Sequence, residues 1–206
     1  MYLTQTLHRA VQQHPGRTAT IFGDRARTFA EHRERVERLA GALRALGVRD
    51  GARVAMMSLN SDRYMEYLMA VLWAGGVVVP VNTRWSSDEI AASLDDCAVA
   101  VLITDTTFRE QAAEMTGRCA SVSALIDAGE SGEPAAGALD YESLIAGAEP
   151  VDDAWRHGDD LAAIFYTGGT TGRAKGVMLS HANLMTSALG LIASGAFATP
   201  GGAFLH

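Results

Sequence analysis

The chain has 206 residues, of which 48% are hydrophobic and 20% charged, as in ordinary globular domains. Its formal net charge of −7 argues against nucleic acid as a main partner. Cys97 and Cys119 lack the spacing of zinc or disulfide motifs, and the most apolar stretch, 67–81, is too short to span a bilayer and is interrupted by Gly and Pro. Because no signal peptide is visible either, we expect a cytoplasmic protein without a membrane span.

Segments with helix and strand patterns alternate along the chain. A capping box at Thr28 and Glu31 begins an amphipathic helix that ends at Gly47. Fewer than three heptads precede this glycine, which favours a core-facing helix over a coiled coil. The elements expected next are a strand at 53–58, a buried helix at 61–76, a strand at 77–81, a helix at 86–97 capped by Ser86, a strand at 98–104, a helix at 105–117 and a strand at 121–127.

This alternation predicts the fold class. Continuous apolar strands separated by helices are typical of a parallel sheet that is covered on both faces. We therefore expect an α/β fold with a mostly parallel sheet layered with helices. From 128 to 160 the pattern changes to Gly, Pro, Ala and acidic residues, with one short helix near 140–148. Residues 127–160 contain ten Asp and Glu and a single cation, Arg156, so we interpret them as a solvated surface connection.

The most unusual segment is TGGTTGRAKG, residues 167–176, which follows the apolar run 161–166. The flanking residues predict a buried strand before this loop and, after it, a strand at 176–181 and a helix from 181. Lys175 is the only lysine among the 17 Lys and Arg residues. Glycine leaves backbone N–H groups accessible, threonine adds hydroxyls, and an ammonium adds a compact positive charge. The composition therefore suits a polyphosphate ligand.

Two familiar phosphate-binding loops do not fit this segment. A Walker A loop requires Gly-Lys followed by Ser or Thr, whereas Lys175 follows Ala174 and precedes Gly176. The chain has no Gly-x-Gly-x-x-Gly dinucleotide fingerprint, and it also lacks His-Glu-x-x-His and Gly-x-Ser-x-Gly.

Other polar residues receive structural interpretations. We expect Asn82 and Arg84 to fix the turn after 77–81, and His181 and Asn183 to cap the helix that follows the loop. The remaining histidines show no catalytic spacing, and the three tryptophans are interpreted as packing residues.

The loop resembles the phosphate-binding signature of the adenylate-forming superfamily, which includes acyl- and aryl-CoA synthetases, luciferases and peptide-synthetase adenylation domains. That signature reads approximately Tyr-Thr-Ser-Gly-Thr-Thr-Gly-x-Pro-Lys-Gly, and this chain departs from it at Gly168 and Ala174. The first change removes a hydroxyl and the second removes a φ constraint, but both leave the Thr-Thr-Gly core and the lysine, so we expect binding to survive. Residues 28–103 and VMLSHANL at 177–184 are also similar to acyl-CoA synthetases.

The resemblance implies a reaction and a set of site residues. ATP and a carboxylic acid, fatty or aryl, would form an acyl-adenylate and pyrophosphate, and the acyl group would pass to coenzyme A with release of AMP. Lys175 would be catalytic, and Thr167 would lie nearest Mg²⁺, although a strand-end hydroxyl that caps backbone groups explains this threonine equally well. The residues implied to contact the phosphates are Thr167, Gly168, Gly169, Thr170, Thr171, Gly172 and Lys175.

The resemblance also implies that the chain is incomplete. Residues 1–206 would be the N-terminal portion of an AMP-binding (adenylation) domain, part of the large domain of an acyl-CoA synthetase-like fold. The rest of that domain and the C-terminal lid would be absent, so we expect the chain alone to be inactive and its exposed sheet edge to favour self-association. The alternative is a non-catalytic phosphate-binding or scaffolding module.

Overall fold

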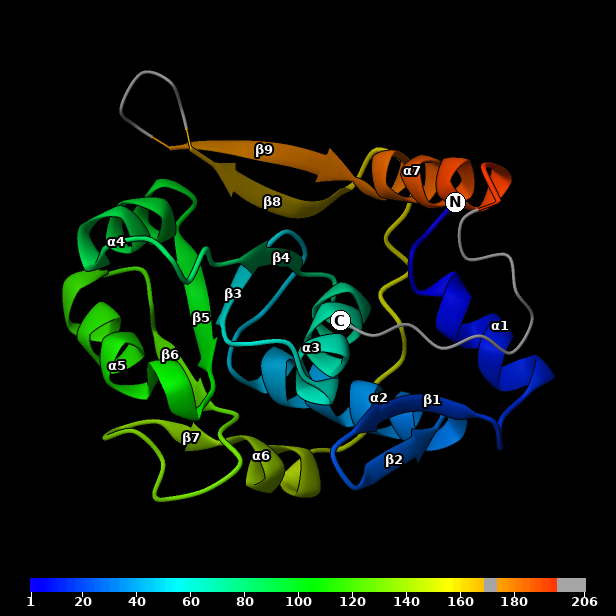
Figure 1. Ribbon diagram of the computed structural model, residues 1–206, viewed down its shortest axis with the longest axis horizontal. Helices are drawn as coiled ribbons and strands as arrows, with labels where there is room; N and C mark the ends of the chain where they lie inside the picture. Colours follow the sequence, from blue (N-terminus) through cyan, green and yellow to red (C-terminus); the bar gives the residue numbers. More distant parts are fainter. Residues whose placement is uncertain (169–173, 196–206) are drawn as a thin grey trace.

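The computed structural model describes residues 1–168 and 174–195, and within them the chain forms a layered α/β structure (Figure 1). The helices are α1 (Gln5–Gln13), α2 (Phe29–Ala45), α3 (Asp62–Ala74), α4 (Ser87–Asp96), the 3₁₀ helix η1 (Thr106–Phe108), α5 (Arg109–Arg118), α6 (Tyr141–Gly147) and α7 (His181–Ala193). The strands are β1 (Thr18–Phe22), β2 (Arg25–Thr28), β3 (Arg53–Met57), β4 (Val77–Pro80), β5 (Val99–Thr104), β6 (Ala124–Asp127), β7 (Leu139–Asp140), β8 (Leu161–Thr167) and β9 (Lys175–Ser180).

The main sheet confirms the expectation of a mostly parallel fold. Its strand order over the described residues is β7-β6-β5-β3-β4-β8-β9, and β1 and β2 form a separate antiparallel hairpin. All neighbours from β7 to β8 pair in parallel, whereas β8 and β9 are antiparallel. The short connection at 168–174 explains this exception, because a parallel pair needs a crossover of a dozen or more residues.

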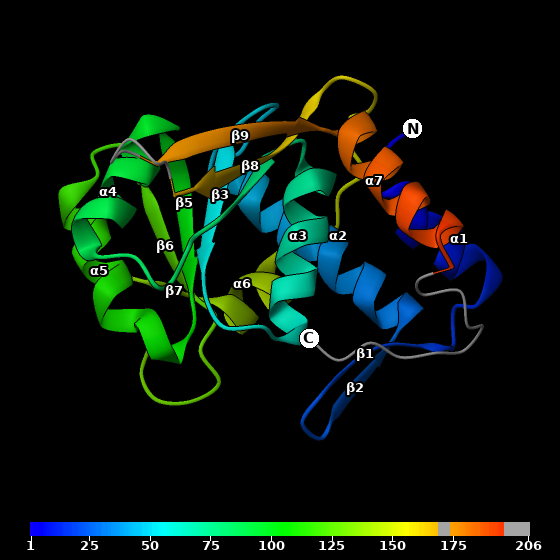
Figure 2. The same cartoon turned by 45° about the horizontal axis from the view of Figure 1, so that its top comes forward.

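The sheet lies between two groups of helices, as expected for strands that are apolar on both faces. Along β3 the side chains alternate, since Val54 and Met56 join the core under α2, α3 and α6, while Ala55 and Met57 join the core under α4 and α5. Figure 2 shows α4 and α5 on one side of the strands and α2, α3 and α6 on the other. This alternation is the two-residue period of a strand, here used to fill two cores at once.

The predicted helix starts at Thr28 and Ser86 are confirmed, whereas the helix predicted from 105 begins as the 3₁₀ helix η1 and becomes α-helical only at Arg109. At the start of α2, the Thr28 hydroxyl accepts a hydrogen bond from the N–H of Glu31, and the Glu31 carboxylate accepts one from the N–H of Thr28. The same reciprocal pair joins Ser86 and Glu89 at the start of α4. Each box satisfies N–H groups that the first turn of a helix leaves without intrahelical acceptors.

Helix α3 is buried as expected, but it also buries charge. Glu66 is 0% exposed and receives bonds from Arg35 Nε at 2.7 Å and from the Tyr141 hydroxyl at 2.9 Å. Arg27 Nε lies 3.1 Å from the same carboxylate. Because a buried carboxylate needs compensating partners, these contacts tie α3 to β2, α2 and α6.

The interpretation of 127–160 as a solvated connection is wrong for two of its carboxylates. Asp127 is 3% exposed and binds Arg109 Nε at 2.5 Å, and Asp153 is 5% exposed and lies 2.9 Å from His8 Nε2. Burial raises the pKa of Asp127, but the bond from Arg109 and those from the N–H groups of Ala135 and Gly129 outweigh it and leave the pKa below its usual value. Acidic composition alone does not show which carboxylates will find arginine partners elsewhere in the fold.

His8 has partners that its position in the sequence does not reveal. Its ring stacks on Trp73 with centroids 4.6 Å apart and on Trp155 with centroids 4.8 Å apart, while its Nε2 faces Asp153. The packing role expected for these tryptophans is confirmed, and the stack holds α1 against the segment before β8.

Across residues 1–168 and 174–195, the helices are either too short or too polar to cross a bilayer.

Candidate phosphate-binding site

The glycine-rich loop joins β8 to β9 at one end of the sheet. The antiparallel pairing runs from Leu161↔Ser180 to Thr167↔Lys175, so the threonine and the lysine singled out by the sequence form the last pair before the loop. Thr167, Gly168 and Lys175 are all exposed. The other expected phosphate contacts lie outside the described residues: Gly169, Thr170, Thr171 and Gly172.

The strand that leads into the loop differs from the expected buried strand. Ala162, Ala163 and Ile164 are buried, but Phe165 is 40% exposed. The neighbouring strand explains this, because β4 pairs with β8 at Val78↔Ala163 and ends at Pro80. The loop end of β8 therefore runs past the sheet together with β9.

Successive side chains of the β8–β9 ribbon point to opposite faces of the ribbon. Residues directly paired across an antiparallel ladder share a face, so Thr167 and Lys175 lie on the same face as Phe165 and Val177. Phe165 and Val177 are 40% and 42% exposed. The hydroxyl of Thr167 and the ammonium of Lys175 thus stand beside each other at a strand end, where both can approach an anion from one side.

Tyr166 lies on the other face and faces helix α4. Its hydroxyl donates to Asp96 Oδ2 at 2.7 Å. Burial, this bond and the nearby Cys97 raise the pKa of Tyr166, so the phenol stays protonated and keeps donating. A Cβ on its cross-strand partner, Gly176, would lie 3.1 Å from the Tyr166 ring atom Cζ. Sequence reasoning missed this contact, because a tyrosine 70 positions after the end of α4 gives no pairing signal by itself. Only the hairpin register reveals the opposing glycine.

The departure at Gly168 from the family signature is not forced by space. Among the described residues, a Cβ built on Gly168 would meet nothing within 4 Å, whereas one on Gly176 would come within 2.9 Å of Ile164 Cγ2. A serine therefore fits at 168, and the glycine at 176 is the one that the packing requires.

Residues after the loop have structural roles, with one correction. Asn183 closes a capping box with Ser180 at the start of α7, as expected for a capping residue. His181 is not a cap, because it is the first residue of α7 and its Nδ1 accepts a bond from the N–H of Leu3. Asn82 fixes its turn as predicted, since its Oδ1 accepts from the N–H of Arg84 at 3.1 Å.

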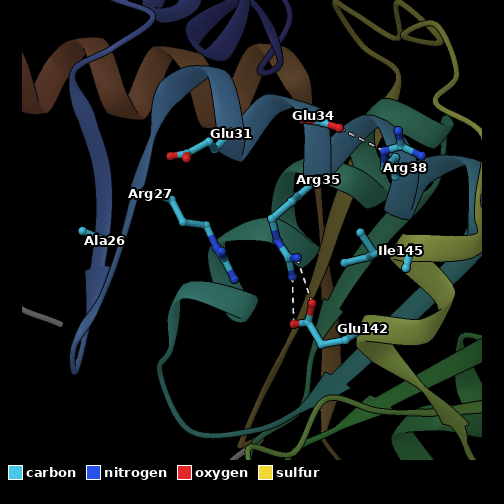
Figure 3. Close-up of a pocket in the computed structure, with 9 residues that line it drawn as sticks. Ala26, Arg27, Glu31, Glu34, Arg35, Arg38, Glu142 and Ile145 are labelled. Atoms are coloured by element: carbon cyan, nitrogen blue, oxygen red, sulfur yellow. Dashed lines mark hydrogen bonds and ion pairs between the residues drawn. The ribbon is translucent and has the colours of Figure 1, made fainter.

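A surface pocket of ≈ 340 Å³ lies elsewhere, between β2, α2 and α6 (Figure 3). Arg35 in this pocket points at Glu142, with bonds of 2.8 and 2.9 Å, and Arg38 faces Glu34 at 3.2 Å. None of the pocket residues belongs to the glycine-rich loop, and the carboxylates compensate these arginines. The pocket is therefore part of the ion-pair cluster around Glu66 and is not a candidate phosphate site.

Comparisons with known proteins place the chain in a family. The family model "AMP-binding enzyme" matches residues 7–205. The chain is 40% identical over 176 residues to a feruloyl-CoA synthase from Amycolatopsis sp. This alignment covers 85% of this chain and 33% of that protein. It is 37% identical over 186 residues to tyrocidine synthase 2 from Brevibacillus parabrevis. That alignment covers 90% of this chain and 5% of that protein.

A solved structure agrees with these matches. The anthranilate CoA ligase AuaEII in complex with anthranoyl-AMP superimposes with a TM-score of 0.80 and 27% identity, over 87% of this chain and 35% of that chain. The chain thus spans about a third of the length of these two CoA ligases. With the family model covering nearly every residue and the α/β layers superimposing, the chain belongs to the AMP-binding enzyme family.

Proposed function

We propose that the protein represented by this chain is an AMP-forming acid–CoA ligase. A carboxylate attacks the α-phosphate of ATP, pyrophosphate leaves, and the thiol of coenzyme A then displaces AMP from the acyl-adenylate to give the thioester. The observation that carries this proposal is the pairing of Thr167 with Lys175 at the base of a glycine-rich loop, in a chain of the AMP-binding family. In this proposal residues 1–206 are the N-terminal portion of the adenylation domain.

Charge is the main obstacle in the first half-reaction, because an anionic carboxylate must approach a triphosphate. Lys175 supplies a compact, mobile positive charge to the phosphates, and exposed backbone around Gly168 leaves room for phosphate oxygens to approach. Gly169, Thr170, Thr171 and Gly172 are proposed phosphate contacts on the family resemblance. Holding the phosphates in one place also supplies the positioning on which such a displacement depends.

Magnesium is the metal implied by the family, and Thr167 is the residue proposed to hold it. The threonine hydroxyl is an exposed oxygen donor at the strand end, next to Lys175. Mg²⁺ prefers oxygen ligands and is commonly held by one or two protein groups together with substrate phosphates, so a single hydroxyl fits. When bound, the ion would neutralise phosphate charge; Thr167 contributes an oxygen to it and Lys175 neutralises the phosphates from the same face.

The names of the relatives favour an aromatic or other organic acid as the substrate. Feruloyl-CoA synthase and anthranilate CoA ligase are named for aromatic acids and coenzyme A, which supports an aryl acid as one choice beside a fatty acid. The 37% identity to tyrocidine synthase 2 supports a second candidate, in which the activated acid is an amino acid destined for a peptide. Both candidate functions begin with adenylation of an acid, and they differ in which acid is activated.

A chimera tests the proposal. This chain would replace the matching third of the Amycolatopsis feruloyl-CoA synthase, with a Lys175→Ala chimera as the matched control, and ATP–pyrophosphate exchange would be measured with aryl acids, fatty acids and amino acids. We expect exchange in the first chimera and a loss of about 10²–10³-fold in the control, the usual effect of removing one preorganised charge contact. A folded chimera without acid-dependent exchange would contradict ligase activity and favour the non-catalytic phosphate-binding module.

The 206-residue chain alone is proposed to be inactive. The resemblance to the adenylate-forming superfamily implies that adenylation is assisted by a second lysine on the lid, and Lys175 is the only lysine in these 206 residues. Incubation with ATP, Mg²⁺ and the same acids should release no pyrophosphate above background, although weak binding of ATP or pyrophosphate should persist. Turnover comparable to that of the chimera would overturn this expectation.

A further inference from the structure

The loop end of the β8–β9 ribbon leaves the sheet before the loop begins. The register of β8 with β4 is confined to Val78↔Ala163, and Pro80, the last residue of β4, has no N–H with which a ladder could continue. A two-stranded ribbon is marginally stable alone and twists readily. The positions of Thr167 and Lys175 therefore depend on contacts from other elements.

Tyr166 provides such a contact. Its hydroxyl donates to Asp96, the last residue of α4, at 2.7 Å, a length typical of a charge-assisted O–H···O⁻ bond. The ring packs on the core under α4 and α5. Both views of the molecule place the loop end of the ribbon on the α4 side of the sheet (Figures 1 and 2).

The glycine opposite Tyr166 makes this contact possible. A Cβ at Gly176 would lie 3.1 and 3.2 Å from ring atoms of Tyr166, so a side chain there would displace the ring. Tyr166↔Gly176 is also the pair next to Thr167↔Lys175. Since neighbouring residues of a strand point to opposite faces, an anchor at Tyr166 fixes the backbone from which Thr167 and Lys175 project on the other face.

We propose that Tyr166 is a positioning residue for the phosphate loop, and that its bond to Asp96 fixes the strand end carrying Thr167 and Lys175. This inference rests on the proposed function of the loop. Tyr166 acts through the backbone and does not touch the nucleotide, because its hydroxyl faces α4. Removal of the hydroxyl should leave the buried half of β8 in place while the loop base shifts relative to α4. The affinity for a phosphate ligand should fall, and the stability of the fold should change little.

Binding of magnesium pyrophosphate to the 206-residue chain, measured by calorimetry, tests this inference. Tyr166→Phe should raise the Kd roughly tenfold, the lower end of what a hydrogen bond to a charged group contributes. Tyr64→Phe is the matched control, because Tyr64 is a half-buried tyrosine of α3 that packs against Tyr67 and should bind the ligand like the unmodified chain. Gly176→Ala, which displaces the same ring, should weaken binding as Tyr166→Phe does.

A double-mutant cycle separates positioning from a general structural effect. Asp96→Ala should weaken binding as much as Tyr166→Phe, and the double variant should be no weaker than either, because both remove one bond. Unfolding midpoints of the two single variants should remain close to that of the unmodified chain.

The possible failures differ from one another. Equal Kd values for the unmodified chain and Tyr166→Phe, additive losses in the cycle, or a large fall in the unfolding midpoint would each overturn the positioning role. No binding by the unmodified chain would overturn the proposed phosphate function itself, and the inference with it.

Discussion

Replacement of Glu66 by glutamine should destabilise the protein strongly, because this carboxylate is wholly buried among cations. The change keeps the length of the side chain but removes its charge and turns an NH₂ group toward donors. With the NH₂ group in place of Oε2, Arg35 would lose its 3.0 Å bond and the buried Tyr141 hydroxyl its acceptor at 2.9 Å. The remaining oxygen could still accept from Arg35 Nε, now at 2.7 Å, and face Arg27 Nε, now at 3.1 Å, but without a negative charge.

The size of the loss in stability depends on which ion-pair contacts Arg35 and Arg27 retain. Removing one member of a buried ion pair costs about 3–5 kcal/mol. Arg35 retains Glu142 at 2.8 Å, and Arg27 retains Asp62 at 3.6 Å, so neither guanidinium is left wholly uncompensated. We therefore expect a loss near the lower bound, about 3 kcal/mol in the free energy of unfolding, or roughly 6–12 °C in Tm for a chain of this size.

Urea unfolding followed by far-UV circular dichroism would measure the loss, with Glu34→Gln as the matched control. Glu34 lies on α2, the helix that carries Arg35, and pairs with Arg38 at 3.2 Å, but its side chain is 63% exposed. Its replacement should cost less than about 0.5 kcal/mol, as for other exposed pairs. Equal losses in the two variants would refute the reasoning that burial, and not the ion pair itself, sets the cost.

Four further predictions concern the loop, pH and association. Lys175→Arg in the chimera should lower ATP–pyrophosphate exchange about tenfold or more despite the retained charge, since a planar guanidinium replaces a compact ammonium; undiminished exchange would refute this. Gly168→Ser should lower the Kd for magnesium pyrophosphate a few-fold without loss of Tm, because a Cβ there meets none of the described residues within 4 Å and the hydroxyl adds a donor; a lower Tm would show that the site lacks room. Asp127→Asn should reduce stability at neutral pH, and because the pKa of Asp127 is depressed below 3.8, that difference should shrink as the pH falls below about 4 in denaturation curves; a constant difference would contradict the assigned ion pair. The chain should self-associate in sedimentation experiments through the exposed faces of β9 and α7, and Met178→Asp with Ile192→Glu, which replace side chains 66% and 56% exposed, should favour the monomer; a monomeric unmodified chain would count against it.

Much of the layered fold is readable from local sequence, because its signals are local. Capping boxes at Thr28 and Ser86 predict helix starts through contacts between residues three apart. Runs of apolar residues in the α3 and β3 segments predict that these elements are buried. The glycine-rich loop is recognised by its own composition and by its resemblance to a known signature. Such features depend on residues that are close in the chain, so they can be predicted without knowledge of the tertiary structure.

The partners of charged and polar groups were decided by the tertiary structure. Arg35 and Glu66 are 31 positions apart, and His8 and Asp153 are 145 apart, so their pairing depends on how α1, α2, α3 and the segment before β8 are packed. The same holds at the candidate site, where Asp96 and Tyr166 meet across 70 positions.

The sequence by itself therefore determined the α/β class, the helix starts at the Thr28 and Ser86 capping boxes and the position of the loop at the end of an apolar strand. Only the tertiary structure decided that β8 leaves the sheet at Ala163 and that Thr167 and Lys175 form the closing pair of the ribbon. It also decided that α4 holds the ribbon through Tyr166. The physical reason is that strand register and long-range hydrogen bonds arise from the packing of whole elements, and no short stretch of sequence encodes them.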